Sequence, residues 1–212
     1  MTGYWDERHE LTPEPTTEMD VDDQNGGRHL VFLARVDDES VRDALRPTLD
    51  ALAEFDCLAV VPQSYLHVTV TVAGNVGPDQ RLSAGDEADI AAAGREAFAD
   101  APAFEVTFPR LDLFPSVVFA AVDDGGSLRG LNERACGIEG IEVHDRDEGY
   151  VPHLTLAQFR SQKGYEDLLA WLEGNRTLDV PSVRVTDVEL VAVDLDERFP
   201  DFETVARYPL AD

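Results

Sequence analysis

The hydrophobic positions change their spacing along the chain, and each change marks a short strand or helix. Short apolar runs, most of them rich in β-branched residues, predict strands at 29–36, 57–62, 65–72, 104–108, 117–122, 151–157, 183–185 and 188–193. Apolar residues at helical spacing predict helices at 39–54, about 83–99, 127–137 and 165–172. Some predicted strands follow one another directly instead of alternating with helices. This order favours an α+β fold over a strictly alternating doubly wound sheet.

The first part of the chain lacks such a period. Residues 1–27 contain several prolines, glycines and acidic residues and few apolar ones, so we expect an acidic, flexible leader. Residues 28–212 are then expected to form a single domain, which fits the length of 212 residues.

The charge of the chain is strongly one-sided. It has 43 acidic and 17 basic residues, a formal net charge of −26, and Lys163 is its single lysine. Concentrated salt screens such self-repulsion, so the composition indicates a halophilic cytoplasmic protein; an ordinary acidic protein is the alternative. No segment has the features of a membrane span or signal peptide, and we expect a monomer. Cys57 and Cys136 are expected to be buried apolar residues rather than a disulfide framework.

Two similar phrases carry the candidate chemistry. His67 and Thr69 are two residues apart in one predicted strand, and His153 and Thr155 repeat the arrangement in another. Residues two apart on a strand point to the same face, so each strand presents an imidazole beside a hydroxyl. Two histidines suit proton transfer at both ends of one displacement, and two hydroxyls suit the non-bridging oxygens of a phosphate. The pattern therefore predicts a phosphodiester site that needs no metal or other cofactor.

Other uses of these residues stay open. Histidines can be hydrogen-bonded core residues, or they can bind a metal, with His144 and Asp145 as further ligands. No glycine-rich phosphate loop is present, which argues against nucleoside triphosphate and dinucleotide binding. The negative charge disfavours broad contact with long RNA, so we expect only an RNA end to enter the site.

The two H-x-T phrases, together with the residues around them from about Arg28 to Leu210, resemble the two-histidine (2H) phosphoesterase superfamily, and in particular the LigT-like RNA 2′,3′-cyclic phosphodiesterases of the 2′-5′ RNA ligase family. The resemblance implies a bilobal α+β fold with two antiparallel sheets facing a central cleft and helices outside. It implies hydrolysis of 2′,3′-cyclic phosphate at RNA ends, with His67 as proton donor and His153 as proton acceptor. Thr69 and Thr155 would hold the phosphate oxygens.

The sequence also departs from the family pattern. Gln158 stands five residues after the second histidine, where arginine is frequent, and Arg160 is the nearest candidate to contact an anionic substrate. Tyr65, Tyr150 and Phe159 flank the motifs and are candidates to stack on a base. Two other interpretations stay open: a cyclic phosphodiesterase for a small nucleotide such as an ADP-ribose cyclic phosphate, and a non-catalytic module that binds RNA ends or nucleotides.

Overall fold

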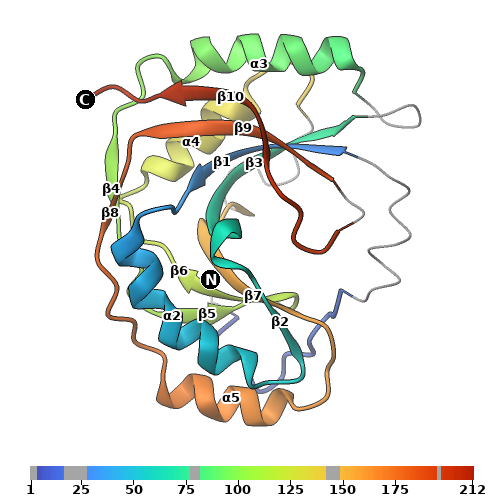
Figure 1. The fold of residues 1–212 in the computed structure, drawn as a ribbon, viewed down its shortest axis with the longest axis vertical. Helices are drawn as coiled ribbons and strands as arrows, with labels where there is room; N and C mark the ends of the chain where they lie inside the picture. Colours follow the sequence, from blue (N-terminus) through green and yellow to red (C-terminus); the bar gives the residue numbers. More distant parts are fainter. Residues whose placement is uncertain (1–3, 17–27, 77–81, 142–148, 195–196) are drawn as a thin grey trace.

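The computed structural model describes residues 4–16, 28–76, 82–141, 149–194 and 197–212 (Figure 1). Its helices are α2 (Glu39–Ala53), α3 (Ala84–Phe98), α4 (Ser127–Cys136) and α5 (Tyr165–Gly174), with a short 3-10 turn, η1 (Gln63–Tyr65). The strands of the main sheet are β1 (Arg28–Arg35), β2 (Leu58–Val60), β3 (His67–Val76), β5 (Leu111–Leu113), β6 (Val117–Ala121), β7 (His153–Phe159), β9 (Asp187–Asp194) and β10 (Glu203–Pro209). β4 (Phe104–Val106) and β8 (Val183–Val185) form a separate pair.

The main sheet is antiparallel and consists of two halves. Its strand order is β10-β9-β1-β3-β7-β6-β5, and β2 also pairs with β7. The halves meet between β3 and β7, where Val68 pairs with Leu154. The upper half in Figure 1 contains β10, β9, β1 and β3, and the lower half contains β7, β6, β5 and β2. The predicted α+β fold with antiparallel sheets is confirmed, and the two motif strands are the ones that join the halves.

The helices form where the sequence supplies both a cap and an apolar face. In α2, the carboxylate of Asp38 accepts hydrogen bonds from the first backbone N–H groups, while Val41 and Leu45 are buried on the inner side. The helix continues through Pro47. In α3, Ser83 and Asp86 form a reciprocal capping box.

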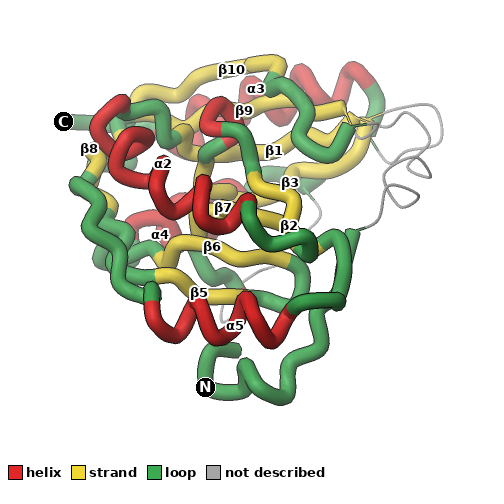
Figure 2. The backbone as a smooth tube through the Cα atoms, turned by 60° about the horizontal axis from the view of Figure 1, so that its bottom comes forward, coloured by secondary structure: helices red, strands yellow, loops and turns green. Residues whose placement is uncertain are grey.

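The helices cover the outer sides of the sheet. The hydroxyl of Tyr208 on β10 donates to the carbonyl oxygen of Ala91 on α3. A Cβ atom at Gly94 would lie 2.6 Å from the Tyr208 ring, so only glycine allows this close approach. α2 and α5 lie beside the lower half of the sheet, as Figures 1 and 2 show.

The segment 4–16 packs against the lower half of the molecule, beside α5 (Figure 2). The Tyr165 hydroxyl donates to the carbonyl oxygen of Arg8, and Arg8 forms an ion pair of 2.7 Å with Glu173. The backbone N–H groups of Glu14 and Thr16 donate to the carbonyl oxygens of Pro115 and Phe159. The expectation of a flexible leader is therefore wrong for residues 4–16. Residues 17–27 lie outside the described part of the chain.

Within the described residues, none of the helices is long and apolar enough to span a membrane.

Candidate active site

The two motifs lie on the two strands that meet at the centre of the sheet. Val68 and Leu154, the residues inside the motifs, are 2% and 0% exposed, whereas the flanking histidines and threonines are half-buried. This alternation confirms the prediction that each histidine shares a strand face with its threonine. Because Val68 pairs with Leu154, the strand register places His67 and Thr69 beside Thr155 and His153.

The two histidine rings are held in the same way. Nδ1 of His67 lies 2.6 Å from the carbonyl oxygen of Tyr65, and Nδ1 of His153 lies 2.8 Å from the carbonyl oxygen of Val151. A carbonyl oxygen can only accept, so Nδ1 of each ring carries the proton that it donates. In the neutral ring, Nε2 then holds the lone pair, which makes it the atom that can take up and release a proton.

Aromatic rings surround His67. Tyr65 and Phe202 each lie 5.0 Å from its ring centre in edge-to-face geometry, and they stack on each other. This burial lowers the pKa of His67 to about 4, although the hydrogen bond to Tyr65 opposes the shift. The nearby charges of His153 and Arg35 lower the pKa further. The His67 ring is therefore neutral near pH 7 in the absence of a ligand.

Aromatic rings also contact the His153 ring. Its ring centre is 5.1 Å from that of Phe114 and 5.3 Å from that of Phe119. Phe114 in turn contacts Tyr4 of the N-terminal segment, with 5.5 Å between the ring centres. Phe114 thus contacts both His153 and a segment far away in the sequence.

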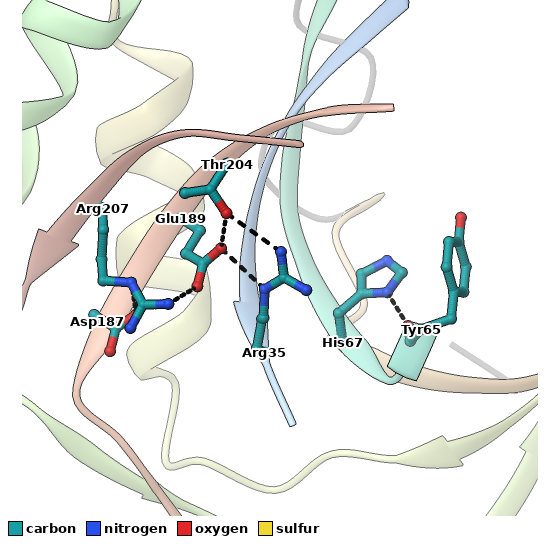
Figure 3. A network of polar contacts seen from close by, with 7 residues as sticks. All are labelled: Arg35, Tyr65, His67, Asp187, Glu189, Thr204 and Arg207. Atoms are coloured by element: carbon teal, nitrogen blue, oxygen red, sulfur yellow. Dashed lines mark hydrogen bonds and ion pairs between the residues drawn. The ribbon is translucent and has the colours of Figure 1, made fainter. Parts of the chain in front are cut away.

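A buried ion pair lies on the other side of His67 (Figure 3). Glu189 on β9 is 1% exposed, and its carboxylate accepts hydrogen bonds from Arg35, Thr204 and Arg207. Burial alone would raise the pKa of Glu189, but the hydrogen bonds from Arg35 and Thr204 outweigh it and keep the pKa below its usual value. The Arg35 guanidinium also lies 4.8 Å above the ring centre of Phe202, so the ion pair supports the aromatic wall around His67.

Two cavities adjoin the motifs. One, of about 290 Å³, is lined by His153, Thr69, Tyr150 and Asn132 among others. The other, of about 320 Å³, is lined by His67, Thr69 and Arg198 among others. Because Thr69 lines both, the cavities adjoin each other at the first motif. Together they form the candidate cleft.

The structure places some of the predicted substrate-binding residues at the two cavities and others away from them. Tyr65 lines the cavity beside His67, and its contact with substrate stays a prediction. Tyr150 lines the cavity beside His153, is 6% exposed, and its hydroxyl donates to the carbonyl oxygen of Thr69. Burial raises the pKa of Tyr150 well above its usual range. It therefore supports the first motif rather than offering an open stacking face.

Two of these predictions are wrong. Phe159 is 0% exposed and belongs to the core, so it cannot stack on a base. Arg160 follows the end of β7, and its Nε donates to the carbonyl oxygen of Asp56. Seven residues of extended chain separate it from His153, a distance of roughly 20 Å. Arg160 therefore does not reach the histidines.

Arg198 lies at the site, although the sequence pattern did not indicate it. Arg198 lines the cavity beside His67, where its guanidinium donates to the side-chain oxygen of Gln158 and to the carbonyl oxygen of Thr16. Gln158 occupies the position at which the family resemblance leads one to expect an arginine. The sequence holds no signal for this contact, because it joins residues 40 positions apart.

Within the described ranges, no three His, Cys, Asp or Glu side chains gather in a way that would hold a metal ion. His144 and Asp145, the further ligands considered above, lie outside those ranges.

A family model and a named relative each match most of the chain. The family model described as the 2′-5′ RNA ligase superfamily matches residues 32–197. The protein from Methanothermobacter thermautotrophicus named RNA 2′,3′-cyclic phosphodiesterase is 27% identical over 176 residues, which cover 80% of this chain and 92% of that protein.

Solved structures show the same fold. A crystal structure of a protein from Thermus thermophilus has a TM-score of 0.62 at 21% identity and covers 86% of this chain and 97% of its own. Escherichia coli LigT complexed with 3′-AMP has a TM-score of 0.63 at 15% identity, with 88% of this chain and 99% of LigT covered.

Proposed function

Because the chain belongs to the 2′-5′ RNA ligase superfamily, we propose that it is a metal-independent phosphodiesterase that opens 2′,3′-cyclic phosphates at RNA ends. The observation that carries the proposal is the matched pair of histidines. Both Nδ1 atoms are anchored on the carbonyl oxygen two residues earlier, so both rings present Nε2 for proton transfer. A site that only bound an RNA end would not need an acid and a base held in the same way.

The proposed reaction uses one histidine at each end of a displacement at phosphorus. Nε2 of His153 takes a proton from water while the water oxygen bonds to phosphorus. The bond from phosphorus to one ribose oxygen breaks, and Nε2 of His67 gives its proton to that oxygen. The product is a ribose phosphomonoester with a free hydroxyl. Proton exchange with water restores both rings.

In this order of roles, which the family resemblance implies, the His67 ring has to be protonated when the substrate reacts. Its pKa of about 4 leaves the ring neutral in the empty site, so the proton has to be acquired together with the substrate. A cyclic phosphate carries a negative charge, and an opposite charge close to an imidazole favours its protonated form. We infer that substrate binding itself raises the pKa of His67.

The remaining side chains fit the needs of the phosphate. The hydroxyls of Thr69 and Thr155 lie on the same strand faces as the histidines and would donate to the non-bridging oxygens. The Arg198 guanidinium adds a positive charge to the cavity beside His67. Glu197 and Asp194 line the same cavity, so a long polyanion would meet repulsion there.

The relatives support a nucleotide end as substrate. The Methanothermobacter protein is named for 2′,3′-cyclic phosphodiesterase activity, and LigT was solved with 3′-AMP, a ribose phosphomonoester. The net charge of −26 disfavours affinity for RNA away from its end.

The decisive experiment incubates the purified protein with a short RNA that ends in a 2′,3′-cyclic phosphate, in molar KCl with EDTA. We expect a gain of one water (about 18 Da) and a new phosphatase-sensitive phosphate. His67→Ala and His153→Ala should each lower kcat by about 10²-fold or more. The matched control is His9→Ala, since His9 is exposed and contacts Glu173 away from the cleft.

The outcomes separate the alternatives. Full activity in both cleft variants would refute the mechanism, and loss of activity in EDTA that zinc restores would favour a metal site. Turnover of a small cyclic nucleotide but not of the RNA end would change the substrate class. Tight binding without product would favour the non-catalytic module.

The roles of the two histidines can be tested separately. A phosphodiester with a 4-nitrophenolate leaving group does not need a proton on departure. His67→Ala should therefore lose much less activity on this substrate than His153→Ala. The reverse result would exchange the two roles.

A further inference from the structure

The cavity beside His153 has features that the phosphate chemistry does not use. Tyr4 and Val151 are the large hydrophobic side chains that stand exposed in the described residues, at 48% and 47%. Both line this one cavity, next to His153 and Thr69. Its volume of about 290 Å³ lies near the lower end for small-molecule sites.

The residue Tyr4 comes from outside the part of the chain that the family model matches, which begins at residue 32. The segment that carries it is nevertheless held firmly. The Trp5 ring lies under the Arg176 guanidinium at 3.8 Å, and the Gln162 side chain donates to the carbonyl oxygen of Pro13. Tyr4 itself contacts Phe114, which contacts His153. An aromatic face is thus fixed at the edge of the cleft, one ring away from the catalytic imidazole.

One residue that lines the same cavity is buried and has a side-chain atom without a hydrogen-bond partner among the described residues. Asn132 is 1% exposed, and its side-chain nitrogen donates to the carbonyl oxygen of Val70. Its Oδ1 is buried and has no hydrogen-bond partner among the described residues. Leaving such an acceptor unpaired is costly, and a ligand that brings an N–H donor would remove this cost.

We propose that this cavity binds the nucleobase next to the cyclic phosphate, with Tyr4 as the stacking face and Asn132 Oδ1 as an acceptor for an amino group on the base. The proposal rests on the proposed function for the position of the phosphate, at Thr69 and the two histidines. It assigns Tyr4, at the start of the N-terminal segment, a part in substrate recognition. An apolar edge with one buried acceptor suits a planar heterocycle that carries an amino group.

The test compares two substrates with the same reacting centre: adenosine 2′,3′-cyclic phosphate, and ribose 2,3-cyclic phosphate, which lacks the base. In Tyr4→Ala, the ratio of kcat/KM for the nucleotide over the baseless sugar should fall about 10-fold, mainly through KM. Tyr4→Phe keeps the ring and should keep the ratio. Glu10→Gln changes an exposed residue of the same segment away from the cavity and should also keep it. An equal loss on both substrates, or an unchanged ratio in Tyr4→Ala, would overturn the proposal.

A second comparison tests the acceptor without changing the protein. Purine riboside 2′,3′-cyclic phosphate differs from the adenosine compound by lacking the amino group. The wild-type protein should favour the adenosine compound about 3- to 10-fold in kcat/KM. Equal values would remove Asn132 from the proposal.

Binding measurements keep this proposal separate from the proposed reaction. Calorimetry with 3′-AMP and with inorganic phosphate requires no turnover. Tyr4→Ala should weaken 3′-AMP relative to phosphate by about 10-fold even if the protein opens no cyclic phosphate. Equal affinity of wild type and Tyr4→Ala for 3′-AMP would refute the base site, whereas absent turnover with intact binding would refute only the reaction.

Discussion

Val68 on β3 pairs with Leu154 on β7, and this pair joins the two halves of the main sheet between the catalytic candidates. Each residue lies inside an H-x-T motif and is buried. The packing of two apolar side chains therefore sets the distance between the two imidazoles, because His67 and His153 flank them on the opposite strand face.

This relationship predicts that Leu154→Ala harms activity beyond its effect on stability. Truncating a buried leucine costs about 2–5 kcal/mol in free energy of unfolding, and Leu156→Ala, at another fully buried position on β7, should cost a similar amount. Small misplacements of reacting groups can lower rates by large factors. At equal folded fraction, we expect kcat of Leu154→Ala to be about 10-fold below that of Leu156→Ala. Equal kcat values would show that the junction does not set the histidine geometry.

The proposed contact of the two threonine hydroxyls with the phosphate predicts the activity of their variants. Thr69→Val and Thr155→Val remove a hydroxyl at nearly constant volume, whereas the serine variants keep it. A hydrogen bond to a charged group is worth about 1.5–3 kcal/mol, so each valine variant should lose about 10- to 150-fold in kcat/KM. The serine variants should lose much less. Valine and serine variants of equal activity would argue against phosphate contact by the hydroxyls.

The central strands were predictable because their pattern is local. Alternating apolar and polar residues around His67 and His153 fixed both strands and their common faces. β10 was missed because its run from Glu203 to Pro209 mixes charged and small residues, as an edge strand does.

The walls of the cleft were not predictable from the same pattern. The contact of Tyr4 with Phe114 and that of Arg198 with Gln158 join positions far apart in the chain, and no local period records them. The family pattern instead drew attention to Arg160, which lies beyond the end of its strand. The monomeric state and the cytoplasmic location expected from composition stay predictions.

The charge predicts that salt stabilises the fold. With a net charge of −26, self-repulsion opposes the compact state at low salt, and the Debye length falls from about 10 Å at 0.1 M to about 3 Å at 1 M. Raising KCl over this range should raise Tm by about 5 °C, which corresponds to about 1–2 kcal/mol for a protein of this size. The control is the same series near the sequence pI of 4.3, where the net charge vanishes and the gain should shrink. An equal gain at both pH values would assign the effect to something other than self-repulsion.

The environment of His67 predicts where its ionisation appears in the pH profile. His67 is the proposed proton donor, and in the free protein its ring carries the proton to be donated only below pH about 4. As pH rises through about 4 the ring loses this proton, so kcat/KM should fall from there rather than from about 6.5. Stability should change in the opposite direction: the unfolded chain binds more protons on this histidine between pH 4 and 6.5, so unfolding becomes less favourable as pH rises through that window.

Phe202→Ala provides the matched test of the cause. Phe202 lies 5.0 Å from the His67 ring, and removing its ring would admit water to the imidazole. Because burial is the main cause of the lowered pKa, the pH at which kcat/KM begins to fall should move upward, toward 6.5, in this variant. An NMR titration of the His67 ring in the ligand-free wild type should show almost no protonation between pH 6 and 8, and added phosphate should increase it. A wild-type midpoint near 6.5, or a fall in kcat/KM that does not move in Phe202→Ala, would show that the aromatic wall does not control the proton on His67.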